Sequence, residues 1–139
     1  MTTQAAAAAA MRKELKLAFP QCSFRIRSKG YSGGDSVDIY WTDGPTTKEV
    51  ELIAKKYQYG HFDGMIDCYE YSNNRADIPQ TKYVFTQRMI SRESEEKIVK
   101  RLSRYGVIQD QGFDREKYYP ELQAYGSTLI NREASDLSL

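Results

Sequence analysis

The chain has 139 residues, of which 40% are hydrophobic and 28% are charged. This size fits one domain with one ordinary hydrophobic core. The charges nearly cancel, at +1 for the whole chain, which argues against a wholly basic nucleic-acid binder and against a strongly acidic mimic of DNA, but is compatible with a local basic patch.

The N-terminal segment is predicted to form a helix over residues 3–18. The alanines of residues 5–10 have the highest helix propensity. Met11, Leu15 and Ala18 then follow at helical spacing, and Phe19-Pro20 ends the helix. Because alanine side chains bury little surface, we expect the first turns of this helix to fray.

A first unit of two strands and a helix is predicted next. The strands cover residues 24–27 and 36–41, and the glycine-rich segment 29–35 joins them. The helix begins with a capping box of Thr46 and Glu49. Its buried stripe has four members: Val50, Ile53, Ala54 and Tyr57. Gly60 is predicted to supply the left-handed residue at its C-terminus.

A second unit repeats this order. Strands are predicted over 65–71 and 82–89, and a helix capped by Ser91 over 92–104. Beyond it, a short helix over 115–124 is expected, kinked or confined by Pro120.

These elements predict an α+β fold, built as a two-layer sandwich. We expect a four-stranded antiparallel sheet made of two ββα units, with helices on one face. The alanine-rich helix of residues 1–20 joins the helical layer, and residues 21–125 form the α+β domain. Residues 126–139 lack a dense apolar pattern, and we expect a partly ordered tail there.

The uncovered face of this sheet is the predicted binding surface. Strand alternation places the following side chains on it: Arg25, Arg27, Asp38, Tyr40, Asp67, Tyr69 and Tyr71. The last strand adds either the set Lys82, Val84, Thr86 and Arg88 or the alternate set with Tyr83 and Phe85.

Tyrosine beside arginine on an open sheet suits nucleic acid, because rings and guanidinium planes stack on bases and the charges meet phosphates. The same residue types suit a protein interface, and they also occur on solvated sheet faces. Arg101 and Arg104 give the third helix a basic side, which also complements its dipole. The candidate binding residues are Arg25, Arg27, Tyr40, Tyr69, Tyr71, Arg88, Arg101 and Arg104.

No catalytic constellation, cofactor site or metal site is predicted. His61 is the only histidine, and with Asp63, Asp67 and Glu70 nearby it forms an acid–base pair or a weak metal site only if these groups converge. A structural role in a turn is the simpler interpretation. The glycines of residues 30–34 do not match a nucleotide-binding loop.

The two cysteines are interpreted as reduced thiols. No segment has the pattern of a signal peptide or of a membrane span, so we expect a cytoplasmic protein. Cys68 alternates with Asp67 and Tyr69 in a predicted strand, and we expect it to face the core with Ile66.

One stretch resembles a known family. The residues YSGGDSVDIYWTDGPTTKEVELIAKKY and then GHFDGMIDCYEY, within Tyr31 to Tyr105, are similar to the twenty-ninth large polyvalent protein-associated domain. This resemblance implies a module of phage- and plasmid-encoded proteins, some of which are thought to travel with the invading DNA and to blunt host defences. It supplies no catalytic residues.

Three functions follow as expectations. The first is a non-enzymatic mobile-element protein in the cytoplasm of a bacterial host that binds a host protein or nucleoprotein complex, including a counter-defence inhibitor of the anti-CRISPR or anti-restriction type. The second is a nucleic-acid-binding accessory protein, and the third is a small enzyme centred on His61. The sequence leaves the oligomeric state open.

Overall fold

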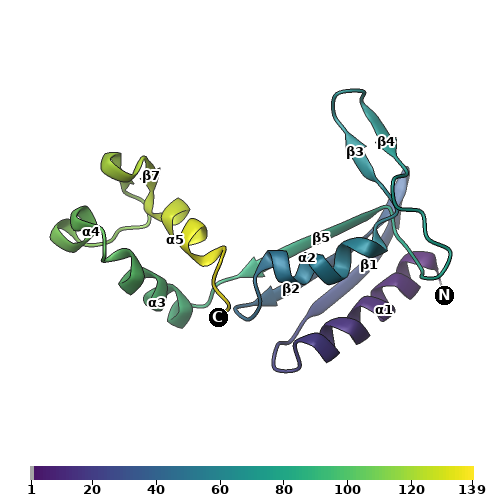
Figure 1. Cartoon of the computed structure of the whole chain (residues 1–139), viewed down its shortest axis with the longest axis horizontal. Coiled ribbons are helices and arrows are strands. Elements are labelled where there is room, and N and C mark those ends of the chain that lie inside the picture. The colour runs from purple at the N-terminus through teal and green to yellow at the C-terminus, as the bar shows by residue number, and fades with distance from the viewer. Residues whose placement is uncertain (1) are drawn as a thin grey trace. The chain divides into compact units, whose positions relative to one another are not determined.

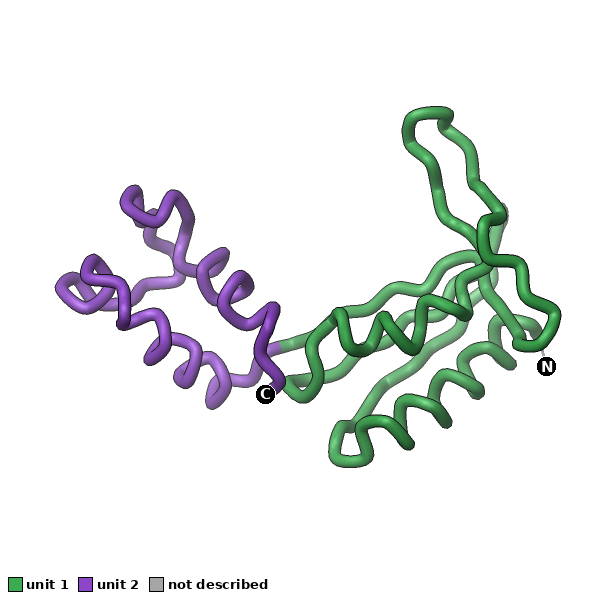
Figure 2. Tube along the Cα trace, viewed as in Figure 1, with its two compact units in different colours: residues 1–89 green, residues 90–139 purple. Residues whose placement is uncertain are grey.

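The computed structural model describes residues 2–139, which form two compact units (Figure 2). Unit 1 extends to Met89, and unit 2 begins at Ile90. Each unit has its own hydrophobic core. The expected division at residues 20 and 125 therefore differs from the compact units, because the apolar residues gather around two centres instead of one.

Unit 1 contains a three-stranded sheet in the order β1-β2-β5. The strands are β1 (Arg25–Tyr31), β2 (Gly34–Thr42) and β5 (Tyr83–Met89). The β1 and β2 strands form an antiparallel hairpin around Ser32 and Gly33, whereas β2 pairs with β5 in parallel. Parallel pairing requires a crossover, and the helix after β2 lies within it.

The prediction of a four-stranded antiparallel sheet is therefore wrong, although the mixed α+β class is confirmed. The third predicted strand does not enter the sheet. Its residues contain only the short strand β4 (Cys68–Glu70), which pairs with β3 (His61–Asp63) in a separate two-stranded hairpin. The segment has no buried apolar side to place in a central strand, since Phe62, Met65 and Ile66 are exposed.

Two helices cover one face of the sheet. They are α1 (Thr3–Ala18) and α2 (Thr47–Ala54), and the 3₁₀ turn η1 (Lys55–Tyr57) extends α2. Figure 1 shows α1 beside β1, and α2 alongside β2 and β5. The predicted bounds of α1 are confirmed. Ala7 and Ala8 are buried in the core, because their small side chains allow close approach.

The capping box of α2 is confirmed. Thr46 Oγ1 accepts from the backbone N–H of Glu49, and a carboxylate oxygen of Glu49 accepts from the backbone N–H of Thr46. Just before it, the Trp41 indole donates to the Pro45 carbonyl at 3.0 Å, which satisfies the polar group of this buried ring. Local sequence signals therefore fix where the crossover helix begins.

Gly60 has a different role from the one predicted. Its φ is not positive, but a Cβ there would lie 2.0 Å from the Glu70 carbonyl oxygen and 2.5 Å from a Tyr69 ring carbon. Only glycine allows the two ends of the β3–β4 hairpin to approach this closely.

The free edge of β5 is covered by side chains from the helical layer. The Val84 backbone N–H donates to Gln58 Oε1 at 2.8 Å, and its carbonyl accepts from Lys55 Nζ at 2.9 Å. Backbone groups that face away from β2 are thereby satisfied.

A carboxylate joins α1 to η1. Glu14 accepts hydrogen bonds from Lys56 Nζ and from the hydroxyl of the buried Tyr57. Burial opposes ionisation of Glu14, but these two hydrogen bonds outweigh it and hold its pKa below the ordinary value of 4.5. The pKa of Tyr57 is raised by its burial and by this carboxylate.

This contact predicts an acid-sensitive contribution to stability. A lowered folded-state pKa stabilises the fold above pH 4.5, and the gain is lost as pH falls through the folded-state value. Because 38% of the Glu14 side chain is exposed, we expect Glu14→Gln to cost less than about 1 kcal/mol at neutral pH. Urea unfolding between pH 7 and pH 3 measures this, and the difference between the two proteins should shrink in acid. Tyr57→Phe, which removes one of the two hydrogen bonds, should give an intermediate loss.

Unit 2 is mainly helical. Its elements are α3 (Arg92–Leu102), α4 (Gly106–Gln111), β6 (Tyr118–Tyr119), η2 (Pro120–Leu122), β7 (Ala124–Tyr125) and α5 (Gly126–Ala134). Ser91 caps α3 as predicted, accepting from the Ser94 N–H at 3.2 Å. Across the described residues, 2–139, none of the helices combines the length and the apolarity that crossing a bilayer requires.

Two expectations for unit 2 differ from the structure. The predicted helix over 115–124 is replaced by the short β6–β7 pair, with Pro120 opening the 3₁₀ turn between them. Where a partly ordered tail is expected, α5 buries Leu129, Ile130 and Ala134 against α3 and α4. These apolar residues are sparse in sequence but lie on one side of a helix.

Candidate binding face

The sheet of unit 1 has one face that the helices leave uncovered. Val37, Ile39 and Trp41 point into the core, so the alternate residues of β2 lie on the opposite side. Register then selects the neighbours of these residues on β1 and β5. We call this surface the open face; its side chains are Arg25, Arg27, Lys29, Tyr31, Ser36, Asp38, Tyr40, Tyr83, Phe85, Gln87 and Met89.

Cations dominate the charge of the open face. Arg27 lies opposite Asp38 in the register, and Lys29 Nζ is 3.1 Å from a carboxylate oxygen of Asp38. The Asp38 side chain is 9% exposed, so its charge is neutralised by Lys29 and shielded from solvent. The Arg25 guanidinium carbon lies 6.0 Å from the centre of the Tyr40 ring. The face therefore offers cations beside an aromatic ring.

Aromatic side chains extend from the open face onto the hairpin. We call Tyr59, Tyr69, Tyr71, Tyr83 and Phe85 the aromatic row. Phe85 stacks on Tyr83 at 5.7 Å between ring centres, and Tyr83 meets the edge of Tyr69 at 5.6 Å. Tyr69 in turn contacts Tyr71 at 5.2 Å and Tyr59 at 5.8 Å. Phe85 and Tyr71, near the two ends, are 53% and 62% exposed.

Lysine and backbone groups hold the row together. Lys82 Nζ lies 5.0 Å from the Tyr69 ring centre and 5.7 Å from that of Tyr83, while it donates to the Gly33 carbonyl at 2.8 Å. The Tyr69 hydroxyl donates to the Lys82 carbonyl at 2.6 Å. Burial raises the pKa of Tyr69, so this hydroxyl stays protonated and keeps its role as donor.

The structure brings together some of the predicted binding residues. Arg25, Arg27 and Tyr40 share the open face, as strand alternation predicts. Tyr69 and Tyr71 belong to the hairpin segment instead of the sheet, yet Tyr69 reaches the open face through Tyr83. These predicted residues therefore lie on two separate elements, and their role in binding stays a prediction.

Other predicted residues lie elsewhere. Arg88 is on the helix-covered side of β5, where it donates to the carbonyls of Asp43 and Gly44, and burial lowers its pKa. Arg101 and Arg104 lie on α3 of unit 2 and both contact Glu133. A hydrogen bond from Arg104 is the main cause that lowers the pKa of Glu133. Because of its hydrogen bonds to the carbonyls of Asp43 and Gly44, Arg88 is a structural residue that holds the turn after β2.

Sequence reasoning missed several residues of this surface. Val84 is buried, which selects the alternate set with Tyr83 and Phe85 on β5. The sequence left both sets open, because the alternation of this strand does not show which side is buried. Lys29 was assigned to a turn, and Tyr59 carries no local signal because only the tertiary fold brings it to Tyr71, at 5.5 Å.

The groups around His61 have separate contacts. His61 is exposed, and its Nδ1 lies 2.9 Å from Ser72 Oγ. Asp63 accepts instead from the Met65 N–H at 3.0 Å, which shapes the hairpin turn. Among residues 2–139, no group of three or more histidine, cysteine or acidic side chains is placed to hold a metal ion.

Both cysteines are free in the described chain. Cys22 is half-buried, and burial raises the pKa of its thiol. Cys68 and Ile66 are exposed, so the prediction that they face the core is wrong. The short β4 strand lies outside the sheet and has no core to face.

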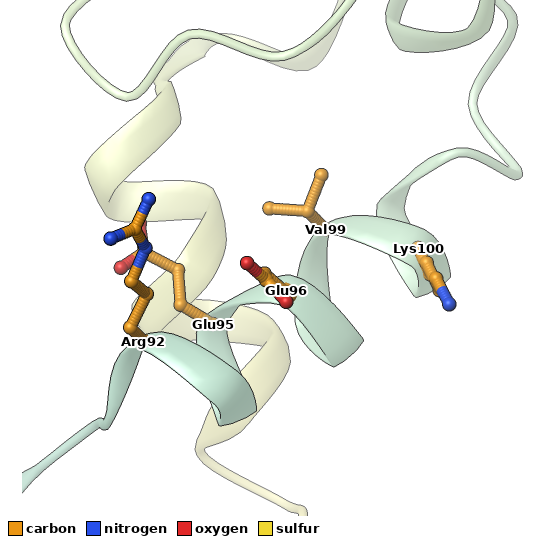
Figure 3. A pocket seen from close by; sticks show the side chains of 5 residues that line it. All are labelled: Arg92, Glu95, Glu96, Val99 and Lys100. Carbon is orange, nitrogen blue, oxygen red and sulfur yellow. The ribbon is translucent and has the colours of Figure 1, made fainter.

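A pocket of about 460 Å³ lies along α3 in unit 2 (Figure 3). It is lined by Arg92, Glu95, Glu96, Val99 and Lys100. Opposite charges alternate along this single helix, and Glu95 is already bound by Arg115 at 2.9 Å. The lining shows no excess of one charge that would select a ligand.

The comparisons with known proteins identify one family. The family model described as Large polyvalent protein associated domain 29 matches residues 2–97. The match confirms the resemblance noted in the sequence, and it extends further toward the N-terminus, across α1. Neither the curated proteins nor the solved structures give a significant match.

Proposed function

Since the chain belongs to the large polyvalent protein-associated domain 29 family, whose domains are associated with phage- and plasmid-type proteins, we propose that it is a non-enzymatic protein that binds single-stranded nucleic acid on its open face. The observation that carries the proposal is the aromatic row, which continues from a sheet face bearing Arg25, Arg27 and Lys29.

The chemistry of this surface favours unpaired bases. Bases that are not stacked in a duplex can lie on exposed rings such as Phe85 and Tyr71. Arg25 and Arg27 on β1, at the other edge of the same face, meet the phosphates, while Asp38 does not repel them because Lys29 neutralises it. In a duplex the faces of the bases are stacked on one another and cannot lie on the protein rings. A duplex would therefore bind through the cations alone.

A protein partner is the alternative for the same face, since tyrosine and arginine are also enriched at protein interfaces. Nucleic acid is preferred because one sheet face carries both cations and exposed rings and the acidic residue among the cations is paired. Inhibition of a host defence complex stays a prediction that follows from the family context.

Binding of labelled oligonucleotides tests the proposal. We expect a fluorescein-labelled oligothymidylate to bind more tightly than a duplex of the same length. The logarithm of affinity should fall with the logarithm of salt concentration, by about 0.7 for each phosphate contacted. Fluorescence anisotropy at several salt concentrations measures both. Absence of binding at low salt, or equal affinity for the duplex, contradicts the proposal.

A further inference from the structure

We propose that the tip of the β3–β4 hairpin, residues 62–67, docks on the open face of a second copy of this chain. This inference goes beyond nucleic-acid binding, because it concerns what occupies the same face when no nucleic acid is present.

The hairpin tip exposes large apolar side chains. Met65 is 97% exposed, Ile66 58% and Phe62 53%. Three large apolar side chains exposed within five residues of one hairpin are typical of a surface that contacts a partner. The Asp63 carboxylate holds the Met65 N–H at 3.0 Å, so the turn that presents these side chains has a defined shape.

The charge of the hairpin selects the partner surface. The tip, residues 62–67, carries the carboxylates of Asp63 and Asp67 and no lysine or arginine. An acidic apolar tip is repelled by anionic lipid and by nucleic acid. It complements a surface that combines cations with exposed apolar groups.

The open face has that combination. Arg25, Arg27 and Lys29 supply the cations, and Phe85 and Met89, which are 53% and 48% exposed, supply apolar surface. The tip carries an aromatic ring and carboxylates, and a nucleotide likewise carries an aromatic base and an anionic phosphate. The features that favour single-stranded nucleic acid on this face therefore also favour the hairpin tip.

The geometry favours a second copy over the same chain. The base of the hairpin is fixed to β5 by the contact of Tyr69 with Tyr83. From there β3 and β4 extend away from the sheet (Figure 1). The tip therefore lies away from the sheet of its own chain. Two copies can exchange tips around a two-fold axis, so that each face receives the partner's hairpin.

Sedimentation of the full chain without nucleic acid tests this inference. At low salt we expect the mass to rise from 16.0 kDa toward twice that value between about 1 μM and about 500 μM, the range of weak association. Raising the salt to about 500 mM should shift the equilibrium back to the monomer, because it screens the charges. A wild-type chain that stays monomeric throughout overturns the inference.

Two variants identify the surfaces. Phe62→Ser with Met65→Ser changes the tip, and Arg25→Glu with Arg27→Glu changes the face. Each is expected to weaken association at least about tenfold. An equimolar mixture should recover part of it, because one intact tip meets one intact face. Association that the tip variant retains, or a mixture with no recovery, overturns the inference.

Two controls keep the outcomes distinct. Both variants should retain the fluorescence of Trp41, the only tryptophan, and the wild-type unfolding midpoint. Oligothymidylate should dissociate the wild-type dimer, whereas the tip variant should bind it at wild-type affinity or better. A monomeric chain that binds oligothymidylate overturns only the docking, and a dimer that ignores it contradicts only the proposed function.

Discussion

Replacing Arg25 and Arg27 together by glutamate is expected to weaken oligothymidylate binding by roughly 100-fold at low salt, because two cations of the open face become anions. The salt dependence should also become shallower. Losing two phosphate contacts lowers the slope by about 1.4. Anisotropy titrations of the variant and the wild type over the same salt range measure both quantities.

A matched pair of substitutions on the helix-covered side of the sheet provides the control. Lys13 and Lys16 are exposed on α1, which packs against the opposite face. Lys13→Glu with Lys16→Glu makes the same change in net charge, and binding should stay within a few-fold of wild type, roughly. If this pair weakens binding as much as the arginine pair, a specific role of the open face is refuted.

Phe85→Ala separates stacking from charge. Phe85 is exposed and stacks on Tyr83, and truncation of a ring that stacks on a base costs about 1–3 kcal/mol. The salt slope should not change, because no phosphate contact is lost. If the salt slope instead falls in proportion to the affinity, the binding depends on electrostatics alone.

Gly60→Ala is expected to lower the free energy of unfolding by at least about 2 kcal/mol, toward the upper range for overpacking. The added Cβ would lie 2.0 Å from the Glu70 carbonyl oxygen, which is backbone and has little room to move. The hairpin base must shift, and Tyr69 with it. Urea unfolding measures the loss, and Gly60→Ala should also weaken oligothymidylate binding because Tyr69 leaves Tyr83.

Gly64→Ala is the corresponding control. Gly64 lies in the same hairpin, but a Cβ there meets no atom within 4 Å and its φ is not positive. We expect a change within about 0.5 kcal/mol, as for an ordinary surface substitution. Equal effects of the two substitutions would mean that general flexibility of the glycines, and not the close approach at Gly60, determines stability.

Local signals in the sequence predicted α1, α2 and α3, but they missed α4 and α5 and predicted the strand partners poorly. The capping residues Thr46 and Ser91 mark helix starts through contacts within three residues, so a short window contains the information. The pairing of β2 with β5 joins segments that are about 40 residues apart. That choice depends on which strand can bury an apolar side under the helices, as β5 does with Val84, and the exposed hairpin between them competes poorly.

The binding face was predicted for the strands whose alternation is clear. Arg25, Arg27 and Tyr40 follow from the buried positions of Val37 and Ile39. Tyr59 and Lys82 join the aromatic contacts only because the crossover returns the chain beside β2. Arg88 was predicted on the wrong side of β5, because its side follows from the pairing of β5 with β2, which the sequence does not show.

The protected edge of β5 determines how copies of this chain can come together. Gln58 and Lys55 already occupy the outward N–H and carbonyl of Val84, so an extended segment from another molecule finds no main-chain partner at that point. Addition of strands from further molecules to this edge is the usual route from an open sheet to aggregates, and it is thereby disfavoured. At this point of the β5 edge, self-association must then rely on side chains, which makes it reversible and sensitive to the solvent.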